Sequence, residues 1–503
     1  MKIGIVSHGY PPELVGGTEN SVQALARGLA RLGHDVFVVA GSMDFDGTFR
    51  RTLGRDEDPD SGKSFPVHRL HRGDLFFDHW QKSACPQIGQ FFEDILREEQ
   101  PDVINVQHWI RLTRDLVARA ARQGVPSVAT LNDLWTTCLI AFRIRPDTQR
   151  FCTSTLSPFP CAGCAAVLQP DAIWMGQTRL IDVVEDFAAD TRRELELASV
   201  VTAPCAGHVK AAATFLGLQA SAIEARVVTP ARKLHSLSVQ DVELPKDSFS
   251  AKSPLVLCHF GIWSPLKGTD LLLEAIAKTR DPKRFRLDLA GGPSKPEFED
   301  TLRNLARAKL PRGSVTFHGR YEHKDLADHA VAGAHLFVTA TRAHESFGLV
   351  LDEAIELGLG CLVPNLGACG ERADQVDWAT AFASGDSSSL AALLDELGDS
   401  PERVAILRAA AAKAVTEEDF TARAQGQAVM AETMLSHLEQ AVKLGIPKSK
   451  RKALMALDWE AREVRLETFN RSWDSDASDG SEAHDEKEAA SPSGASQVTP
   501  RDS

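Results

Sequence analysis

The sequence predicts an α/β protein built from two doubly wound parallel sheets. A short β-rich run, Lys2–Ser7, is followed by a glycine-bearing loop, an amphipathic helix and a second strand at Asp35–Ala40. This is the order of a βαβ unit. The same order starts again at Leu255–Phe260 and continues through a helix over Thr269–Lys278. The chain has 503 residues, which is more than one ordinary domain holds.

The composition, with 43% hydrophobic and 25% charged residues, is that of a soluble globular protein. No apolar run approaches the roughly 18 residues that a membrane span needs. The apolar segment at the N-terminus is too short for a signal peptide, so we expect a cytoplasmic protein. The net charge of −13 includes eight acids against two bases from Asp474 to Ser503, which leaves −7 for the rest. That charge argues against nonspecific nucleic-acid binding.

The first half of the chain alternates between predicted strands and helices, apart from a polar stretch. Residues Gly41–Ser83 lack periodicity, so we expect an insertion or a loop there. The strands are predicted at Asp102–Val106, Ser127–Leu131, Val200–Ala203 and Ala225–Val228, and the helices over Asn20–Leu32, Phe91–Glu98, Arg111–Arg122, Thr178–Leu197 and His208–Leu216.

Polar residues follow two of these strands. His108 comes after the first of them, and Asn132 and Asp133 come after the next. Because the carboxyl ends of parallel strands meet at one edge of a sheet, we expect a substrate crevice there. In the loop before the first helix, Gly16 and Gly17 would let a substrate approach the backbone closely. A purely structural turn is the alternative.

Four cysteines are clustered in the first half, with the last two in a CxxC motif: Cys138, Cys152, Cys161 and Cys164. Four thiols within 27 positions, one pair spaced for shared coordination, predict a structural Zn2+ site. A metal could order this loop, which has little apolar core of its own. An iron–sulfur cluster and ordinary buried thiols are the alternatives.

The second half carries most of the predicted chemistry, in the stretch TRAHESFGLVLDEAIE from Thr341 to Glu356. An apolar run at Ala334–Ala340 predicts a buried strand, which places Glu345 at a strand-to-helix turn on the carboxyl edge of a sheet. The residues that follow Glu345 would offer backbone N–H groups at a helix N-terminus, which is a site for phosphate. They are Ser346, Phe347 and Gly348.

Two further charged residues support a ligand site. Glu353 follows Glu345 by eight residues, so both are expected on similar sides of the helix. A carboxylate in an apolar helix needs a polar partner, and a sugar hydroxyl would serve. Lys267 stands beside Gly268 just before a helix, where it could meet a diphosphate as a point charge. The alternatives are that Glu345 caps the helix, Glu353 is solvated and Lys267 is a surface residue.

The rest of the second half continues the alternation and ends in a charged tail. We expect the basic run Lys448–Lys452 to start a solvated helix or to contact a membrane surface, and Ser472–Ser503 to be disordered. Strands are predicted at Phe285–Ala290, Val315–His318 and Leu362–Asn365, a glycine loop at Gly367–Glu371, and helices over Phe420–Leu444 and Ala453–Phe469.

Taken together, the ordered motifs resemble the GT-B glycosyltransferases of family 4. The motifs are YPP…GGTE, GIWSPLKG, LAGGP, HGR, HESFGLVLDEA with its E-x7-E, and GACGE, over about residues 1–425. The resemblance implies two Rossmann-like domains facing a cleft. It places an acceptor domain at 1–230 with a cysteine-rich insertion at 136–166, a linker at 231–253, a nucleotide-sugar domain at 254–425, helices at 426–470 that return to the first domain, and an acidic disordered tail at 471–503.

The resemblance also implies roles for single residues. Glu353 would hold the ribose hydroxyls of a nucleotide sugar, and Glu345 would contact hydroxyls of the transferred sugar. Lys267 and the amides of Phe347, Gly348 and Leu349 would bind the diphosphate, so that no metal or other cofactor is needed for catalysis. Gly16 and Gly17 would approach the phosphates and the acceptor. The family retains the anomeric configuration, with the departing phosphate taking the proton of the acceptor.

The sequence departs from the family pattern at two positions. After Gly261, the glycine that opens the donor loop of the second domain, the family usually has Arg, whereas this chain has Ile262. We expect Arg320 or Arg342 to supply the missing diphosphate contact. Where the family commonly has a histidine, this chain has Asn132, which could still donate a hydrogen bond to the sugar.

The function expected is therefore a retaining glycosyltransferase that moves a hexose from a nucleotide diphosphate sugar to a glycan or lipid-linked acceptor of cell-surface polysaccharide. The basic helix expected at Arg111–Arg122 permits a peripheral contact with the inner membrane face. Two alternatives stay open, a sugar-nucleotide epimerase on the same fold and a sugar-nucleotide-binding or scaffold protein without activity. No nucleic-acid partner is expected.

Overall fold

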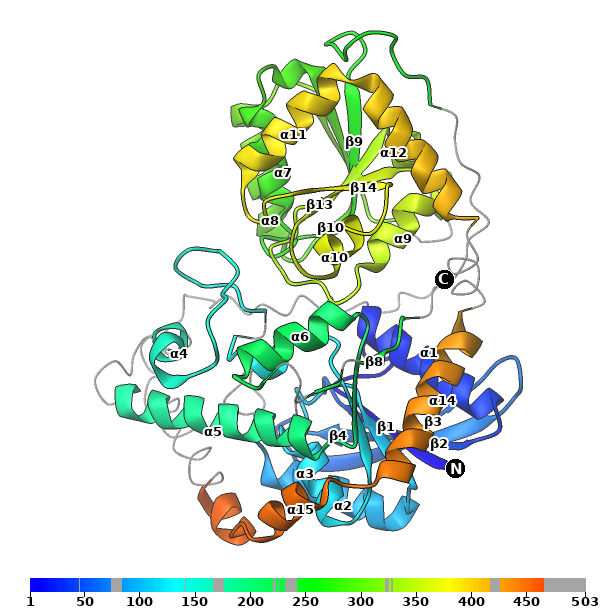
Figure 1. The fold of residues 1–503 in the computed structure, drawn as a ribbon, viewed down its shortest axis with the longest axis vertical. Coiled ribbons are helices and arrows are strands. Elements are labelled where there is room, and N and C mark those ends of the chain that lie inside the picture. The colour runs from blue at the N-terminus through cyan, green and yellow to red at the C-terminus, as the bar shows by residue number, and fades with distance from the viewer. Residues whose placement is uncertain are drawn as a thin grey trace. The chain divides into compact units, whose positions relative to one another are not determined.

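The structure is a computed structural model, and it describes residues 1–44, 46–73, 84–140, 142–165, 176–219, 223–224, 226–230, 242–321, 325–326, 329–416 and 426–465. Its contacts divide the chain into two compact units (Figure 1). Unit 1 contains the described residues of Met1–Arg143, Thr153–Ala231 and Gln427–Ala495. Unit 2 contains those of Ile144–Cys152 and Arg232–Gly426. The predicted acidic tail lies outside the described residues, and so do residues 231–241 of the predicted linker.

Unit 1 is built on an eight-stranded sheet in the order β3-β4-β2-β1-β5-β6-β7-β8. Neighbouring strands are parallel except for β3 and β4. The strands are β1 (Lys2–Ser7), β2 (Asp35–Gly41), β3 (Arg50–Glu57), β4 (Ser64–His71), β5 (Val103–Val106), β6 (Ser127–Thr130), β7 (Val200–Ala203) and β8 (Arg226–Val227). The helices are α1 (Gly17–Arg31), α2 (Pro86–Glu99), α3 (Leu116–Arg122), α4 (Pro158–Ala165), α5 (Gly176–Leu197), α6 (Ala206–Phe215), α14 (Gln427–Leu444) and α15 (Lys448–Met455).

The prediction of an irregular stretch over Gly41–Ser83 is wrong where it covers β3 and β4. These strands pair antiparallel over eight residues, and β4 also pairs with β2. Most of β3 is exposed, as an edge strand allows, so it has no apolar run to detect. In β4, Phe65, Val67 and Leu70 are buried, but Pro66 obscures the strand pattern.

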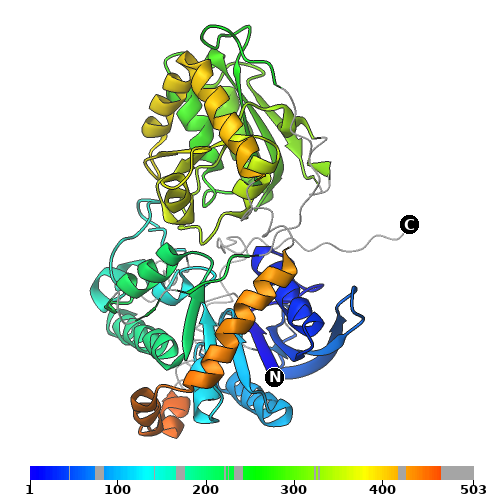
Figure 2. The same ribbon diagram turned by 45° about the vertical axis from the view of Figure 1, so that its right-hand side comes forward.

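The C-terminal helix α14 belongs to unit 1, where it packs beside α1. Val22, Leu25 and Leu29 of α1 form one core cluster with Met434 and Leu438 of α14. Figure 2 shows α14 in orange crossing beside the blue α1. The apolar faces of two helices about 400 residues apart in sequence therefore cover the same side of the sheet.

The predicted basic helix over Arg111–Arg122 is shorter and less exposed than expected. Helix α3 starts at Leu116, and Arg111 has a φ of +62° before it. Arg114 and Arg119 are buried at 3% and 1% exposure. They form ion pairs inside unit 1, so these two arginines present no basic face to a membrane surface.

Part of this buried charge network comes from the end of the chain. Arg462 donates to Asp115 at 2.8 Å and to Asp190 at 2.9 Å. The ring of Trp459 lies under the guanidinium groups of Arg119 and Arg122. The helix expected over Ala453–Phe469 is interrupted at residues 456–458 and resumes at 459–465, the last described residues. This second stretch supplies the contacts.

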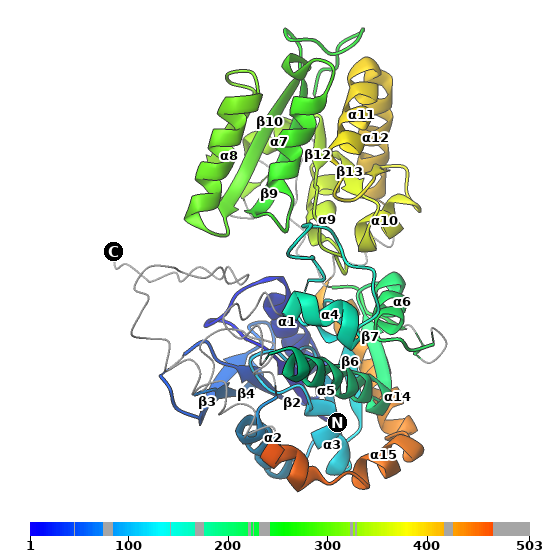
Figure 3. The same ribbon diagram turned by 90° about the vertical axis from the view of Figure 1, so that its left-hand side faces the viewer.

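Unit 2 has a six-stranded, fully parallel sheet in the order β11-β10-β9-β12-β13-β14. Helices α7 and α8 lie beside β9 and β10 (Figure 3). The strands are β9 (Leu255–Trp263), β10 (Phe285–Pro293), β11 (Val315–Gly319), β12 (Leu336–Val338), β13 (Gly360–Pro364) and β14 (Ala379–Phe382). The helices are α7 (Thr269–Lys278), α8 (Pro296–Lys309), α9 (Leu349–Glu356), α10 (Gly367–Ala373), α11 (Ser387–Asp399) and α12 (Pro401–Ala414).

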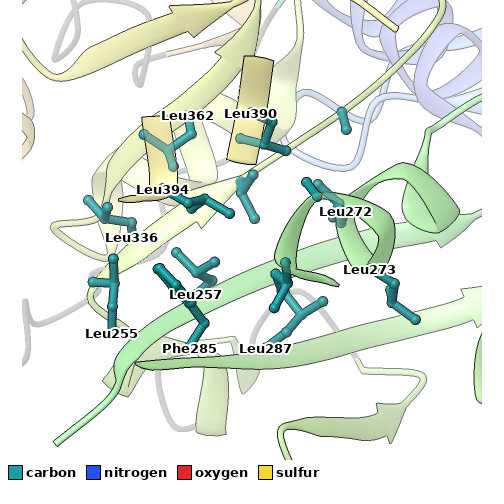
Figure 4. Packing of buried hydrophobic residues seen from close by; sticks show 14 of the residues in the cluster. Leu255, Leu257, Leu272, Leu273, Phe285, Leu287, Leu336, Leu362, Leu390 and Leu394 are labelled. Carbon is teal, nitrogen blue, oxygen red and sulfur yellow. The ribbon is translucent and has the colours of Figure 1, made fainter. Parts of the chain in front are cut away.

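Both faces of the unit 2 sheet are buried. Leu255 and Leu257 of β9 join the cluster under α7 and α11, with Leu272 and Leu390 (Figure 4). Val256 and the other alternate residues of β9 join a second cluster under α9. A strand covered on both sides reads as a continuous apolar run, which is why β9 could be predicted from the sequence.

In each sheet the direction in which successive strands are added reverses at one pair of neighbouring strands. In unit 1 the chain passes from β1 to β2 on one side and later adds β5 on the other. In unit 2 it passes from β9 to β10 and later adds β12. Open α/β sheets bind ligands at the carboxyl edge beside such a switch point. The residues after β1 and β5, and those after β9 and β12, are therefore the ones to consider.

Candidate functional site

Two of the predicted site residues, Lys267 and Glu345, meet at the switch point of unit 2. Lys267 lies in the loop between β9 and α7, and Glu345 in the loop between β12 and α9. The Lys267 Nζ atom donates to Glu345 Oε1 at 2.7 Å, and Thr341 Oγ1 donates to the same oxygen at 2.9 Å. The lysine side chain is 38% exposed and the glutamate 21%, so the pair is accessible to a ligand.

The ion pair keeps both groups charged. Burial opposes ionisation of each group, but the Lys267 ammonium and its hydrogen bond lower the pKa of Glu345 below its ordinary value. Burial likewise opposes the charged lysine, and the Glu345 carboxylate raises the pKa of Lys267. At neutral pH the site therefore offers an ammonium and a carboxylate side by side.

Two glycines allow the loops to approach. Gly268, with a φ of +68°, lies against the Ala340 carbonyl oxygen, where a Cβ atom would overlap it. A Cβ on Gly367, with a φ of +60°, would lie 2.7 Å from the Glu345 carbonyl oxygen and 2.9 Å from its nitrogen. Gly367 was predicted in a loop, but it starts α10, and the amide of Ala368 donates to the Glu345 carbonyl at 2.8 Å.

The N-terminus of α9 adds backbone donors to this edge. The helix begins at Leu349, with Gly348 at the N-cap position and Ser346 and Phe347 in the loop before it. Its first amides and the positive end of its dipole favour an anion. Because Glu345 lies four residues before Leu349, the expectation that Glu345 and Glu353 share one helix face is wrong. The positive φ of Gly348, +77°, sets this helix start.

Arg372 of α10 holds the loop before α9, and the sequence analysis missed it. Its Nη2 donates to Asp352 Oδ1 at 2.6 Å, and its Nη1 donates to the Phe347 and Gly348 carbonyls at 3.5 and 3.4 Å. The guanidinium also lies 5.0 Å from the centre of the Phe347 ring. The arginine of GACGER was the available signal, but its partners 20 to 25 residues away were not apparent from the sequence.

The other residues predicted to bind the donor are more dispersed. Glu353 is half-buried on α9, and its charge adds to burial in raising the pKa of Tyr321. Gly261 and the 53% exposed Ile262 lie near the end of β9. Arg320 is exposed and lies over Gly292 in the loop end of β10.

Arg342 was one of two residues expected to contact the diphosphate in place of the arginine that the family has at position 262. In the structure its guanidinium is paired with a carboxylate. Its two terminal nitrogens both donate to the Asp270 carboxylate at 2.8 Å. Arg342 also donates a main-chain bond to Leu266 at 2.8 Å. Its guanidinium therefore fastens the Lys267 loop to α7, and of the two predicted substitutes Arg320 is the one exposed to solvent.

In unit 1 the predicted polar residues do meet at one edge. Asn132 donates to the Gln107 carbonyl at 3.0 Å and to its side-chain oxygen at 2.8 Å, so both of its amide hydrogens are engaged. His108 Nε2 donates to Asp133 Oδ2 at 3.2 Å. Gly16 precedes α1, and a Cβ on Gly17 would meet no atom within 4 Å.

The four clustered cysteines do not form a metal site in the residues that are described. Among those residues no three Cys, His, Asp or Glu side chains lie close enough to share a metal ion. Burial raises the pKa of Cys138 to about 12, although the backbone hydrogen bonds at this thiol and the charge of Arg143 act in the opposite direction. The structural zinc therefore stays a prediction. None of the described helices is long and apolar enough to cross a bilayer.

Comparison with known families gives two matches that cover most of the chain in order. Residues 15–160 match the family described as Glycosyltransferase Family 4, and residues 241–414 match Glycosyl transferases group 1. No curated protein matches the sequence.

Solved structures share the fold. HepE from Anabaena in complex with UDP aligns with 17% identity and a TM-score of 0.53, over 87% of this chain and 100% of that one. Sucrose-phosphate synthase from Thermosynechococcus elongatus gives 18% identity and a TM-score of 0.59, over 87% and 98%. Trehalose-phosphate synthase from Burkholderia xenovorans, in complex with glucose-6-phosphate, gives 11% identity and a TM-score of 0.56, over 87% and 100%.

Proposed function

The chain is a GT-B glycosyltransferase of the family 4 and group 1 type, and we propose that it transfers a hexose from a nucleotide diphosphate sugar with retention of configuration. The observation that carries this proposal is the Lys267–Glu345 pair at 2.7 Å beside the N-terminus of α9. HepE is crystallised with UDP-glucose, which supports a uridine diphosphate sugar as the donor.

The pair suits a donor that carries both a diphosphate and a sugar. Lys267 and the amides at the start of α9 stabilise the negative charge that grows on the leaving diphosphate. The Glu345 carboxylate accepts hydrogen bonds from hydroxyls of the transferred sugar, and Glu353 accepts those of the ribose. In transfer the bond from the anomeric carbon to the phosphate oxygen breaks, and the acceptor oxygen bonds on the same face. The leaving phosphate takes the proton of the acceptor.

The acceptor we propose is a glycan or a lipid-linked sugar that is a precursor of a cell-surface polysaccharide. We propose that the transfer takes place in the cytoplasm. No divalent cation is needed for this chemistry, since Lys267 and the α9 amides supply the positive charge. The two glutamates of the E-x7-E motif, Glu345 and Glu353, and the ion pair between Glu345 and Lys267 support sugar transfer over a role in scaffolding alone.

The test is a donor screen that measures release of nucleoside diphosphate. We expect turnover with one uridine diphosphate hexose, and its loss in Glu345→Ala while the melting temperature stays close to that of the wild type. Glu297→Ala, which changes an exposed acid in the first turn of α8, is the matched control. Unchanged turnover in Glu345→Ala would contradict the proposed role of that residue.

A further inference from the structure

A second cluster of titratable groups lies in unit 1 and is centred on His8, which the sequence analysis did not select. His8 follows β1 directly, and its Nε2 lies 2.8 Å from Glu19 Oε1 in the first turn of α1. The ring of His108, after β5, lies 4.5 Å from the His8 ring between centroids. Because β1 and β5 are neighbours, this cluster stands at the switch point of the unit 1 sheet.

The hydrogen bonds of His108 are complete. Its Nδ1 accepts from the amides of Trp109 at 3.0 Å and Ile110 at 3.1 Å, so this nitrogen carries no proton. Its Nε2 donates to Asp133 Oδ2 at 3.2 Å, and Asp133 Oδ1 accepts from the Trp135 amide at 2.8 Å. With both nitrogens engaged, His108 supports the cluster and has no position left for a ligand.

His8, in contrast, has one ring nitrogen without a hydrogen-bond partner among the described residues. Its Nε2 is bound to Glu19, and its Nδ1 is buried with no hydrogen-bond partner among the described residues. A buried polar atom without a partner costs about 1–3 kcal/mol, so such atoms usually bond to a ligand or to water. The Ser7 and Thr136 hydroxyls, near the same edge, are also buried without a partner in the described part of the chain.

The charge state of His8 decides what Nδ1 can bind. Burial, then the neighbouring His108 and Arg111, lower the pKa of His8, while the Glu19 carboxylate acts in the opposite direction. The imidazole is therefore neutral near pH 7. Its single proton lies on Nε2, where the Glu19 carboxylate accepts it, and the lone pair on Nδ1 is left to accept a hydrogen bond.

The charges around His8 decide which chemical group can donate a hydrogen bond to Nδ1. The Glu19 carboxylate binds His8 directly and the Asp133 carboxylate binds the neighbouring His108, while the guanidinium of Arg111 acts on His8 through its charge. A phosphate would meet like charge here and would find no proton on Nδ1 to accept. A neutral hydroxyl group has the proton that Nδ1 lacks, and carbohydrates present such groups in number.

We propose that His8 binds a hydroxyl group of the sugar acceptor through Nδ1, with Glu19 fixing the ring and its tautomer. This inference rests on the proposed function, because it assigns the acceptor side of that reaction to unit 1. It also explains the first glycine of the GGTE motif. A Cβ on Gly16 would lie 2.5 Å from Glu19 Oε2 and would push the carboxylate away from His8.

Calorimetry with the full chain tests the inference. Wild-type protein saturated with UDP is titrated with glucose, galactose or glucose 6-phosphate as probes. We expect saturable binding of a neutral hexose, no tighter binding of the phosphorylated sugar, and about tenfold weaker hexose binding in His8→Phe, the loss expected for one hydrogen bond. His34→Asn, at the other end of α1, should bind as the wild type does.

The outcomes separate the inference from the proposed function. Equal hexose affinity in wild type and His8→Phe overturns the inference, and so does a wild-type protein that binds UDP but none of the three sugars. Failure of the wild type to bind UDP overturns the proposed function instead. If His8→Phe melts well below the wild type, Glu19→Gln serves in its place. Its amide can donate to Nε2 and move the ring proton to Nδ1, so hexose affinity should also fall.

Discussion

The switch points of the two sheets occupy equivalent places in the topology but carry groups of different charge. In unit 2, Lys267 and Glu345 are both charged and satisfy one another at 2.7 Å. In unit 1, Glu19 faces the imidazole of His8, which is neutral and has one nitrogen without a partner in the described residues. A charged pair suits a ligand with a diphosphate, whereas a neutral hydrogen-bond acceptor suits a hydroxyl. With similar topology in both sheets, the choice of ligand therefore depends on a few residues after each strand.

The largest effect is expected from removing the cation of unit 2. Lys267→Met should lower turnover by about 10²–10³-fold, because one preorganised group that stabilises the leaving diphosphate is lost and Glu345 is left without its ammonium partner. Steady-state release of nucleoside diphosphate measures this.

Lys278→Met is the matched control for that experiment, since Lys278 ends α7 and contacts only serine hydroxyls among its described hydrogen bonds. It should keep near wild-type turnover. A Lys267→Met enzyme as active as this control would show that the charged pair is not what distinguishes unit 2.

A smaller effect is expected when the backbone of the unit 2 site is displaced. Gly367→Ala places a Cβ 2.7 Å from the Glu345 carbonyl oxygen, whereas Gly385→Ala, also at a positive φ, meets no atom within 4 Å. Both should lose about 1 kcal/mol of unfolding free energy for the left-handed backbone, and Gly367→Ala should lose more because its Cβ overlaps the Glu345 backbone. Only Gly367→Ala should also lose donor affinity, as thermal melting and calorimetry with UDP-glucose would show. Equal donor affinity in the two variants would contradict the positioning role of Gly367.

The smallest effect concerns pH and unit 1. The pKa of His8 is lowered in the folded protein by burial, His108 and Arg111, with Glu19 opposing. As pH falls below the unfolded value of about 6.5, the unfolded chain binds a proton that the folded chain resists, so stability is lost. Between pH 7.5 and 5.5 the wild type should lose about 1 kcal/mol more than His8→Phe in thermal melts. Identical pH dependence would show that His8 is not held neutral by the fold.

The features of the two switch points that depend on local sequence patterns could be predicted from the sequence. Strands β1, β5 and β9 are apolar runs, and Lys267 and Glu345 lie in the loops that follow two predicted strands, so their meeting at one edge of the sheet agrees with the topology. The start of α9 was misplaced because it depends on the positive φ of Gly348, which composition alone does not show.

Long-range pairs set the limit of prediction. The α3 arginines looked like a basic surface because their partners are far away in sequence: Arg119 pairs with Glu93 and Glu463. His8 gave no signal either, since its importance depends on one carboxylate in α1 and on a ring that follows β5. The arrangement of such groups is set by packing, which sequence spacing does not report.

The most direct test of this division is the affinity for UDP-glucose in two variants, one from each switch point. Calorimetry should find that Lys267→Met weakens UDP-glucose binding by at least about tenfold, the loss of one charge-assisted contact, while His8→Phe binds it as the wild type does. The opposite pattern, with donor binding lost in His8→Phe and kept in Lys267→Met, would contradict the assignment of the donor to unit 2.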